Sequence, residues 1–152
     1  MTVPRLILSA VLLAAIAGAA HGQTTPSRLP ILVPITGFVA LEGTSQKNGA
    51  LLALKDAPLK LTPEVIDTGA APEGAVTGFE RALGDKPVAV VAPILGTQML
   101  ALLPLAERYR IPLLTISGTA KITELNNQWV FRFFPGDATV KLKDGNPVLI
   151  RD

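Results

Sequence analysis

The chain has no cysteine, and its only histidine is His21. Without cysteine no disulfide can form, so an exported protein of this sequence must rely on its core or on a bacterial-type periplasmic setting. A Ser-His-Asp triad, a Cys-His pair and an ordinary zinc site all require residues that are absent beyond position 21. Carboxylate or Ser-Lys chemistry stays compatible with the composition. We therefore predict a protein that is not an enzyme, with no catalytic residues, no metal ligands and no cofactor.

Charge is also scarce, at 17% of the chain, and neither lysine nor arginine forms a cluster. The formal net charge is only +2, so nothing indicates a nucleic-acid partner. A GxGxxG element and a P-loop are missing as well. Asp67 could act as a cap or as a ribose-type acceptor, but without GxGxxG a dinucleotide site is not supported.

The N-terminus is where apolar residues concentrate. Arg5 precedes an unbroken small and apolar run over residues 6–20, and Ala20-His21-Gly22 follows it. This pattern is typical of a secretory signal peptide, and we expect cleavage near Gly22 and a periplasmic location. A membrane anchor is the alternative, but the run is short for a bilayer, which needs about 20 apolar residues. Removal of Arg5 with this segment leaves 13 basic residues against 12 acidic ones.

Apolar runs and helical periodicity alternate through the rest of the chain, with glycine and proline between them. This order predicts an α/β fold: a Rossmann-like parallel sheet with helices on both faces. Pro104 is expected to kink or break its helix. The expected strands are residues 29–35, 59–66, 88–92, 112–116 and 130–134, and the expected helices are 43–56, 72–83 and 97–109, with at most one helical turn at 122–125.

The C-terminal segment has a different pattern. Residues 140–151 alternate around Asp144-Gly145, which indicates a β-hairpin. The predicted organisation is a signal peptide (1–22), a polar spacer (23–28), an α/β lobe (29–138) and a hairpin-like tail (139–152).

Hydroxyl- and glycine-rich loops follow several of the predicted strands, at residues 36–44, 93–97 and 117–119. In an open parallel sheet, ligands bind outside the carboxyl ends of the strands. Hydroxyls and free amides at helix starts can hold a carboxylate or another small anion. Any one such loop has a simpler explanation as a helix N-cap, and three at successive junctions favour binding.

Two further features have competing interpretations. Glu42 in the first loop could pair with a ligand ammonium group, or could be a solvated loop charge. Trp129 and the aromatic residues at 131–134 are expected in the core rather than as a stacking platform.

From residue 29 to residue 137 the sequence resembles the periplasmic solute-binding proteins of branched-chain amino acid ABC transporters, which have the type I periplasmic-binding fold of leucine-binding proteins. The segments that carry the resemblance are LVPITGFVALEGTSQKNGALLAL, the DTG turn, VVAPILGTQMLALLPLAERYRIPLLTIS and VFRFFPGD. Their order and spacing are more specific than any one of them.

The resemblance implies a protein of two α/β lobes that close on an amino acid, an amide or an aromatic acid, supplied to a membrane permease. In the family pattern a serine after the third strand grips the ligand carboxylate. Gly96 takes that position here, with Thr97 beside it. A threonine contact after the fourth strand falls on Thr119, with Ser117 and Gly118 alongside. A ligand-covering aromatic falls near Glu42, which suggests a ligand other than a simple aliphatic amino acid.

Family members are roughly twice as long, as expected for two domains. The sequence from Lys141 resembles the C-terminal strand pair of such a protein, so we expect a truncated or internally deleted binding protein. Two alternatives to an importer component are a non-functional fragment and a periplasmic sensor or partner-binding module.

Overall fold

The computed structural model describes residues 27–84, 86–137, 140–143 and 146–149. The predicted signal peptide lies outside these residues. Five strands form one sheet in the order β2-β1-β3-β4-β5, and every pairing in it is parallel. The predicted α/β class with a parallel sheet is therefore confirmed. The strands are β1 (Ser27–Val33), β2 (Leu61–Asp67), β3 (Val90–Val91), β4 (Leu113–Thr115) and β5 (Val130–Arg132).

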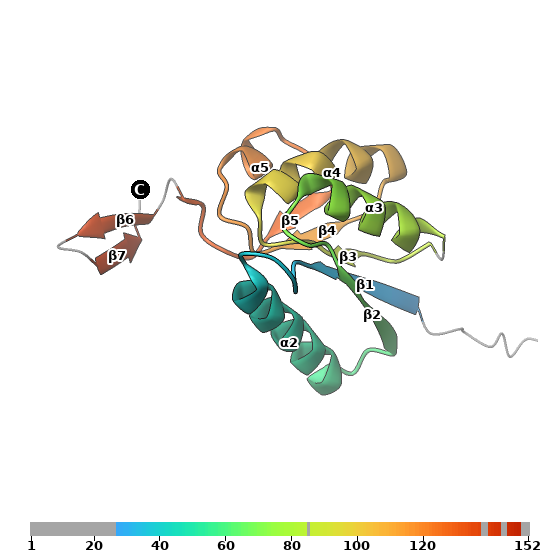
Figure 1. The fold of residues 1–152 in the computed structure, drawn as a ribbon. Coiled ribbons are helices and arrows are strands. Elements are labelled where there is room, and N and C mark those ends of the chain that lie inside the picture. The colour runs from blue at the N-terminus through green and yellow to red at the C-terminus, as the bar shows by residue number, and fades with distance from the viewer. Residues whose placement is uncertain (1–26, 85, 138–139, 144–145, 150–152) are drawn as a thin grey trace, which may run out of the picture.

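Helices cover both faces of this sheet, as predicted (Figure 1). On one face lie α3 (Pro72–Leu83), α4 (Gly96–Tyr109) and the short α5 (Lys121–Glu124). On the other face lies α2 (Ala40–Asp56), which packs along β1 and β2. No helix within the described ranges combines the length and the apolar character needed to cross a bilayer.

The core fills the space between the sheet and the helices α3 and α4. Phe79 and Met99 are fully buried there, because both helices turn an apolar stripe toward the strands. Gly78 lets α3 approach closely, since a Cβ at this position would lie 3.0 Å from the Ile66 side chain. The other fully buried apolar residues of this core include Leu32, Ala75, Val90, Ala92, Leu102, Ala106, Leu113 and Ile122.

Two helices differ in detail from what the sequence predicts. Of the predicted kink or break at Pro104, the break does not occur, because α4 runs without interruption from Gly96 to Tyr109. Pro104 is exposed, so water can reach the backbone carbonyl that loses its helical donor, while Leu102 and Leu103 hold the same helix on the core. Helix α2 begins at Ala40 instead of residue 43, because the Gly37 turn (φ 90°) already directs its carbonyl to the Ala40 N–H.

The prediction for the aromatic residues near β5 holds only in part. Trp129 packs against the core, but Phe131, Phe133 and Phe134 are 46%, 72% and 52% exposed. Phe131 pairs in register with Leu114 and so shares its side of the sheet. That side carries only α2 among the described helices, and α2 lies over β1 and β2. Phe131 therefore has no described helix above it.

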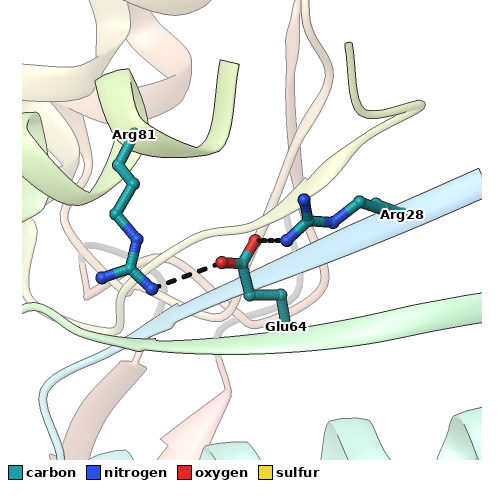
Figure 2. A network of polar contacts seen from close by, with 3 residues as sticks. All are labelled: Arg28, Glu64 and Arg81. Atoms are coloured by element: carbon teal, nitrogen blue, oxygen red, sulfur yellow. Dashed lines mark hydrogen bonds and ion pairs between the residues drawn. The ribbon is translucent and has the colours of Figure 1, made fainter. Parts of the chain in front are cut away.

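Strand β2 is fixed at the sheet edge by an ion-pair network around Glu64 (Figure 2). Glu64 contacts Arg28 of the neighbouring β1 through one carboxylate oxygen and Arg81 of α3 through the other. The network thus connects an edge strand to the strand beside it and to the helix above it.

The tail forms a separate two-stranded antiparallel sheet from β6 (Val140–Lys143) and β7 (Asn146–Leu149). This confirms the predicted hairpin pattern.

Candidate ligand-binding site

The loop after β1 is held by the loop after β2. Asp67 accepts backbone N–H bonds from Ile35 (3.1 Å), Thr36 (3.3 Å) and Gly69 (2.9 Å), and the Thr36 hydroxyl donates to its second oxygen (2.7 Å). Partial desolvation raises the pKa of the Asp67 carboxyl, but these hydrogen bonds outweigh it and hold the pKa below its ordinary value. Asp67 does not cap a helix, because neither α2 nor α3 has a side-chain cap hydrogen bond, and its carboxylate instead ties the loop after β1 to the loop after β2.

Helix α4 begins without a capping side chain. Its N-cap is Leu95, no side chain bonds to its first turn, and that turn contains no acid. The helical ladder starts with the Met99 N–H, which donates to the Leu95 carbonyl at 2.9 Å. The amides of Gly96 and Thr97 therefore lack intrahelical acceptors and carry the positive end of the helix dipole. This helix start is suited to an anion.

A buried glutamine fixes this helix start in place. Gln98 is fully buried, and its side-chain amide donates to the carbonyls of Thr68 (3.2 Å), Gly69 (3.0 Å) and Ala71 (3.0 Å). Its oxygen lies 3.3 Å from the Thr68 hydroxyl. The polar side chain is thus satisfied by the loop after β2, which ties the ends of β2 and α4 together. Sequence reasoning missed this residue, because its partners are backbone groups about thirty positions away.

Gly96 and Thr119 lie in direct contact. An added Cβ at Gly96 would overlap the Thr119 hydroxyl oxygen and lie 2.8 Å from its Cβ. The Thr119 side chain therefore occupies the space that a serine side chain at position 96 would fill. The sequence predicted both positions separately, and the structure shows that the hydroxyl of one replaces the missing side chain of the other.

The loop from Ser117 to Thr119 is also fixed by the segment after β5. The Asp137 carboxylate packs against the Cα of Gly118, and the Asp137 N–H donates to the Gly118 carbonyl at 2.6 Å. Arg132 donates to the Thr119 carbonyl at 3.3 Å. Asp137 and Arg132 were not predicted as site residues. The sequence feature that could have indicated them is the Pro135-Gly136-Asp137 turn, which follows a predicted strand as the other loops do.

Ser117 is buried, with 1% of its surface exposed. Its N–H donates to the Thr115 hydroxyl at 3.0 Å, so this amide serves the loop itself. Its own hydroxyl has no hydrogen-bond partner among the described residues. The remaining predicted residues are Thr97, which is exposed beside Gly96, and Glu42, which lies on α2.

Glu42 does not join the other five residues. It makes no hydrogen bond or ion pair to them within the described part of the chain. Instead it borders a groove whose lining also includes Ile94, which lies in the loop of residues 93–97, and Ile116, which directly precedes the loop of residues 117–119. The structure thus brings Gly96, Thr97, Ser117, Gly118 and Thr119 to one edge and leaves Glu42 on the neighbouring groove.

Solved structures share this fold. A leucine-binding protein from Thermotoga maritima is 22% identical, with a TM-score of 0.68 over 73% of this chain and 33% of that chain. A branched-chain amino acid transporter substrate-binding protein from Streptococcus pneumoniae, in complex with isoleucine, is 18% identical, with a TM-score of 0.70 over 76% of this chain and 36% of that chain. A solute-binding protein of an ABC transporter from Rhodopseudomonas palustris BisB5, in complex with 3,4-dihydroxybenzoic acid, is 24% identical, with a TM-score of 0.69 over 76% and 33%.

These identities show the fold alone, and the chain spans about one third of the length of these structures. No curated protein matches the sequence significantly. A family model described as periplasmic binding protein matches residues 26–142, which is most of the chain. This family consists of binding proteins, so the prediction of a protein that is not an enzyme is confirmed. The chain belongs to the periplasmic binding protein family.

Proposed function

We propose that this chain is the ligand-binding lobe of an exported substrate-binding protein that serves an ABC importer, and that its ligand is an amino acid or a related small carboxylate or amide. The observation that carries the proposal is the uncapped start of α4 beside the Thr119 hydroxyl. No acid lies in this first turn to occupy the positive end of the helix. A ligand carboxylate at this position would accept hydrogen bonds from the backbone amides of Gly96 and Thr97 and from the Thr119 hydroxyl.

Groups of both signs surround this edge and support a zwitterionic ligand. Arg132 lies behind Thr119, and Asp137 packs against Gly118. Glu42 borders the adjoining groove and could receive a ligand ammonium group. An amino acid presents one group of each sign, so it matches this edge better than a simple anion does.

The similar structures support the same ligand class and the transport role. They are a leucine-binding protein and two proteins in complex with isoleucine and with 3,4-dihydroxybenzoic acid, and each of these three compounds has a carboxylate. By this proposal the partner is a membrane permease, and the protein works in the periplasm after cleavage near Gly22. Mass spectrometry of the protein recovered from the periplasm tests the cleavage, and recovery of the intact N-terminus would refute it.

Binding by this lobe alone is expected to be weak. Ligand sites usually bury about 70–90% of the surface of a small ligand. The carboxyl edge of a single sheet covers only one side of the ligand. The contacts that remain must still offset the entropy lost on association. We therefore expect a dissociation constant weaker than about 1 μM.

Isothermal titration calorimetry of the full chain tests the proposal. The probes are L-leucine, 4-methylpentanoate, 3-methylbutylamine and 3,4-dihydroxybenzoate. The probes with a carboxylate should bind, and 3-methylbutylamine, which has none, should not. Thr119→Val should weaken carboxylate binding at least about tenfold, because a charge-assisted hydrogen bond contributes about 1.5–3 kcal/mol.

Thr77→Val is the matched control, since Thr77 is exposed on α3, away from this edge. It should leave the affinity unchanged. Binding of the amine as tight as that of L-leucine, or equal effects of the two threonine substitutions, would show that the carboxylate does not lie at Thr119.

A further inference from the structure

A second pocket lies at the end of the sheet opposite to the carboxyl edge. Helices α3 and α4 run in the same direction over one face of the sheet, and both end at this pocket (Figure 1). Since α4 begins at the carboxyl edge and has 14 residues, the pocket lies about 20 Å from that edge. We call it the amino-end pocket, and its lining consists of Leu83, Lys86, Pro87, Tyr109, Arg110 and Ile111.

The amino-end pocket has the size and the apolar walls of a small-molecule site. Its volume is about 500 Å³, and pockets for small molecules measure about 300–1,000 Å³. Tyr109 is 40% exposed, and its ring lies 6.3 Å from that of Phe79 and 5.3 Å from the guanidinium of Arg108. The ring is thus held in place, and it offers a fixed aromatic surface to an apolar group.

Charge at this pocket favours an anion. Lys86 and Arg110 contribute two positive charges, and the lining contains no acid among the residues that the structure describes. The ends of α3 and α4 oppose them, because the C-terminus of a helix carries about half a negative charge. Two helix ends offset about one of the two positive charges, so the pocket stays positive. The planar guanidinium of Arg110 also matches the geometry of a carboxylate.

The two basic residues share an unfavourable backbone conformation. Lys86 has φ 47° and Arg110 has φ 55°, in the left-handed region where glycine usually ends a helix. This conformation costs a side-chain-bearing residue more than a cation gains beside a helix C-terminus. Helix capping alone therefore does not explain a lysine and an arginine here. Backbone strain of this kind gathers at binding sites.

We propose that the amino-end pocket binds a small carboxylate with an apolar body, with its carboxylate between Lys86 and Arg110 and its apolar body on Tyr109 and Ile111. An anion without an apolar body would leave the apolar walls in water, and a neutral apolar molecule would leave both cations unpaired. This inference goes beyond the proposed function and does not depend on the ligand at the carboxyl edge.

NMR titration of the ¹⁵N-labelled full chain tests the proposal. The probe is 3-phenylpropanoate, and its two controls are 3-phenylpropan-1-ol, which lacks the charge, and acetate, which lacks the apolar body. The amide signals of Leu83, Lys86 and Arg110 should shift and saturate with the probe. The probe should bind here at least about tenfold more tightly than either control.

Asparagine substitutions remove the charges and keep the backbone. Asparagine adopts the left-handed conformation more readily than lysine or arginine does, so Lys86→Asn and Arg110→Asn should melt at least as high as the parent. Each should weaken probe binding at least about threefold, and the double variant at least about tenfold. Lys55→Asn is the matched control, because Lys55 is an exposed lysine in the last turn of α2, and it should leave the affinity unchanged.

A substitution at the carboxyl edge separates the two sites. Thr119→Val should leave the shifts at the amino-end pocket unchanged. Loss of these shifts in Thr119→Val, or shifts confined to residues 117–119, would place the probe at the carboxyl edge and overturn the proposal. Equal binding of the acid and the alcohol, or full binding by the double asparagine variant, would overturn it as well.

Discussion

The Thr119 hydroxyl oxygen occupies the position in which a side chain at Gly96 would begin. The two residues belong to different βα units, since Gly96 starts α4 and Thr119 precedes α5. Their contact places a hydroxyl group beside amides that the helix itself leaves without acceptors. Gly96 therefore contributes to the site because its lack of a side chain leaves room for the Thr119 hydroxyl.

Substitution of Gly96 by alanine should reveal this contact. The new methyl group collides with Thr119, so we expect Gly96→Ala to lower the free energy of unfolding by about 1–2 kcal/mol, although alanine is the better helix former. Adding Thr119→Gly, which removes both the hydroxyl and the Cβ that the new methyl group meets, should restore most of the loss, with a coupling energy of about 1 kcal/mol in the double-mutant cycle. Urea denaturation of the four proteins measures it, and additive effects would show that the side chains do not meet.

Gln98 should matter more than its polarity suggests. Its removal leaves three carbonyl groups of the loop after β2 without their donor. We expect Gln98→Leu to lower the free energy of unfolding by about 2–3 kcal/mol, since a buried polar group without a partner costs about 1–3 kcal/mol. Gln128→Leu is the control, because Gln128 is exposed. A loss below about 0.5 kcal/mol for Gln98→Leu would mean that water replaces the donor.

The Glu64 network should contribute little and depend on salt. Glu64→Gln weakens both ion pairs, and the Arg81 side chain is 67% exposed, so water screens its interaction. We expect a loss of about 0.5–1 kcal/mol at low ionic strength that becomes smaller in 1 M salt. Arg81→Gln should cost less than Glu64→Gln, because it removes only one of the two pairs. Chemical denaturation at two salt concentrations compares them, and a loss that persists unchanged in salt would exclude an electrostatic origin.

Much of the fold could be predicted because its strands are apolar runs and its helices have a regular period. Residues 72–83 were predicted as a helix with the observed bounds, since Pro72 and Gly84 mark its ends. The start of α2 could not be predicted, because it depends on the tertiary turn at Gly37. The exposure of Phe133 also escaped prediction, because an aromatic residue in a strand predicts burial and does not reveal whether a helix lies above it.

The site was predicted as separate loops, and their mutual contacts were not. Gly96 and Thr119 each follow from the rule on carboxyl ends of strands, but no spacing in the sequence reveals that their atoms meet. Arg132 and Asp137 were missed for a related reason. Each acts on the loop of residues 117–119 across a strand pairing, and such pairings are visible only in three dimensions. Glu42 was predicted beside the others because its loop precedes a helix, but it lies within α2 and borders the groove.

Asp67 should make stability depend on acid pH. Its folded-state pKa lies below the ordinary value of 3.8, because its hydrogen bonds outweigh desolvation. The unfolded chain thus binds the proton more readily than the folded one does. The stabilisation from Asp67 is therefore fully present above the ordinary pKa and is lost as the pH falls from that value through the lower folded pKa. Asp67→Asn should cost about 1 kcal/mol at pH 7, because the amide replaces an acceptor of several hydrogen bonds.

The difference between the parent protein and Asp67→Asn should stay constant from pH 7 to about pH 5 and shrink below about pH 4. Urea midpoints at pH 7, 5 and 3 measure it. Asp56→Asn is the control, because Asp56 is exposed at the end of α2 and holds no loop. A difference that grows toward pH 3 would have the opposite sign and would mean that the folded protein binds the Asp67 proton more readily than the unfolded chain. That outcome would also mean that the Asp67 carboxylate does not hold the loop after β1 in place.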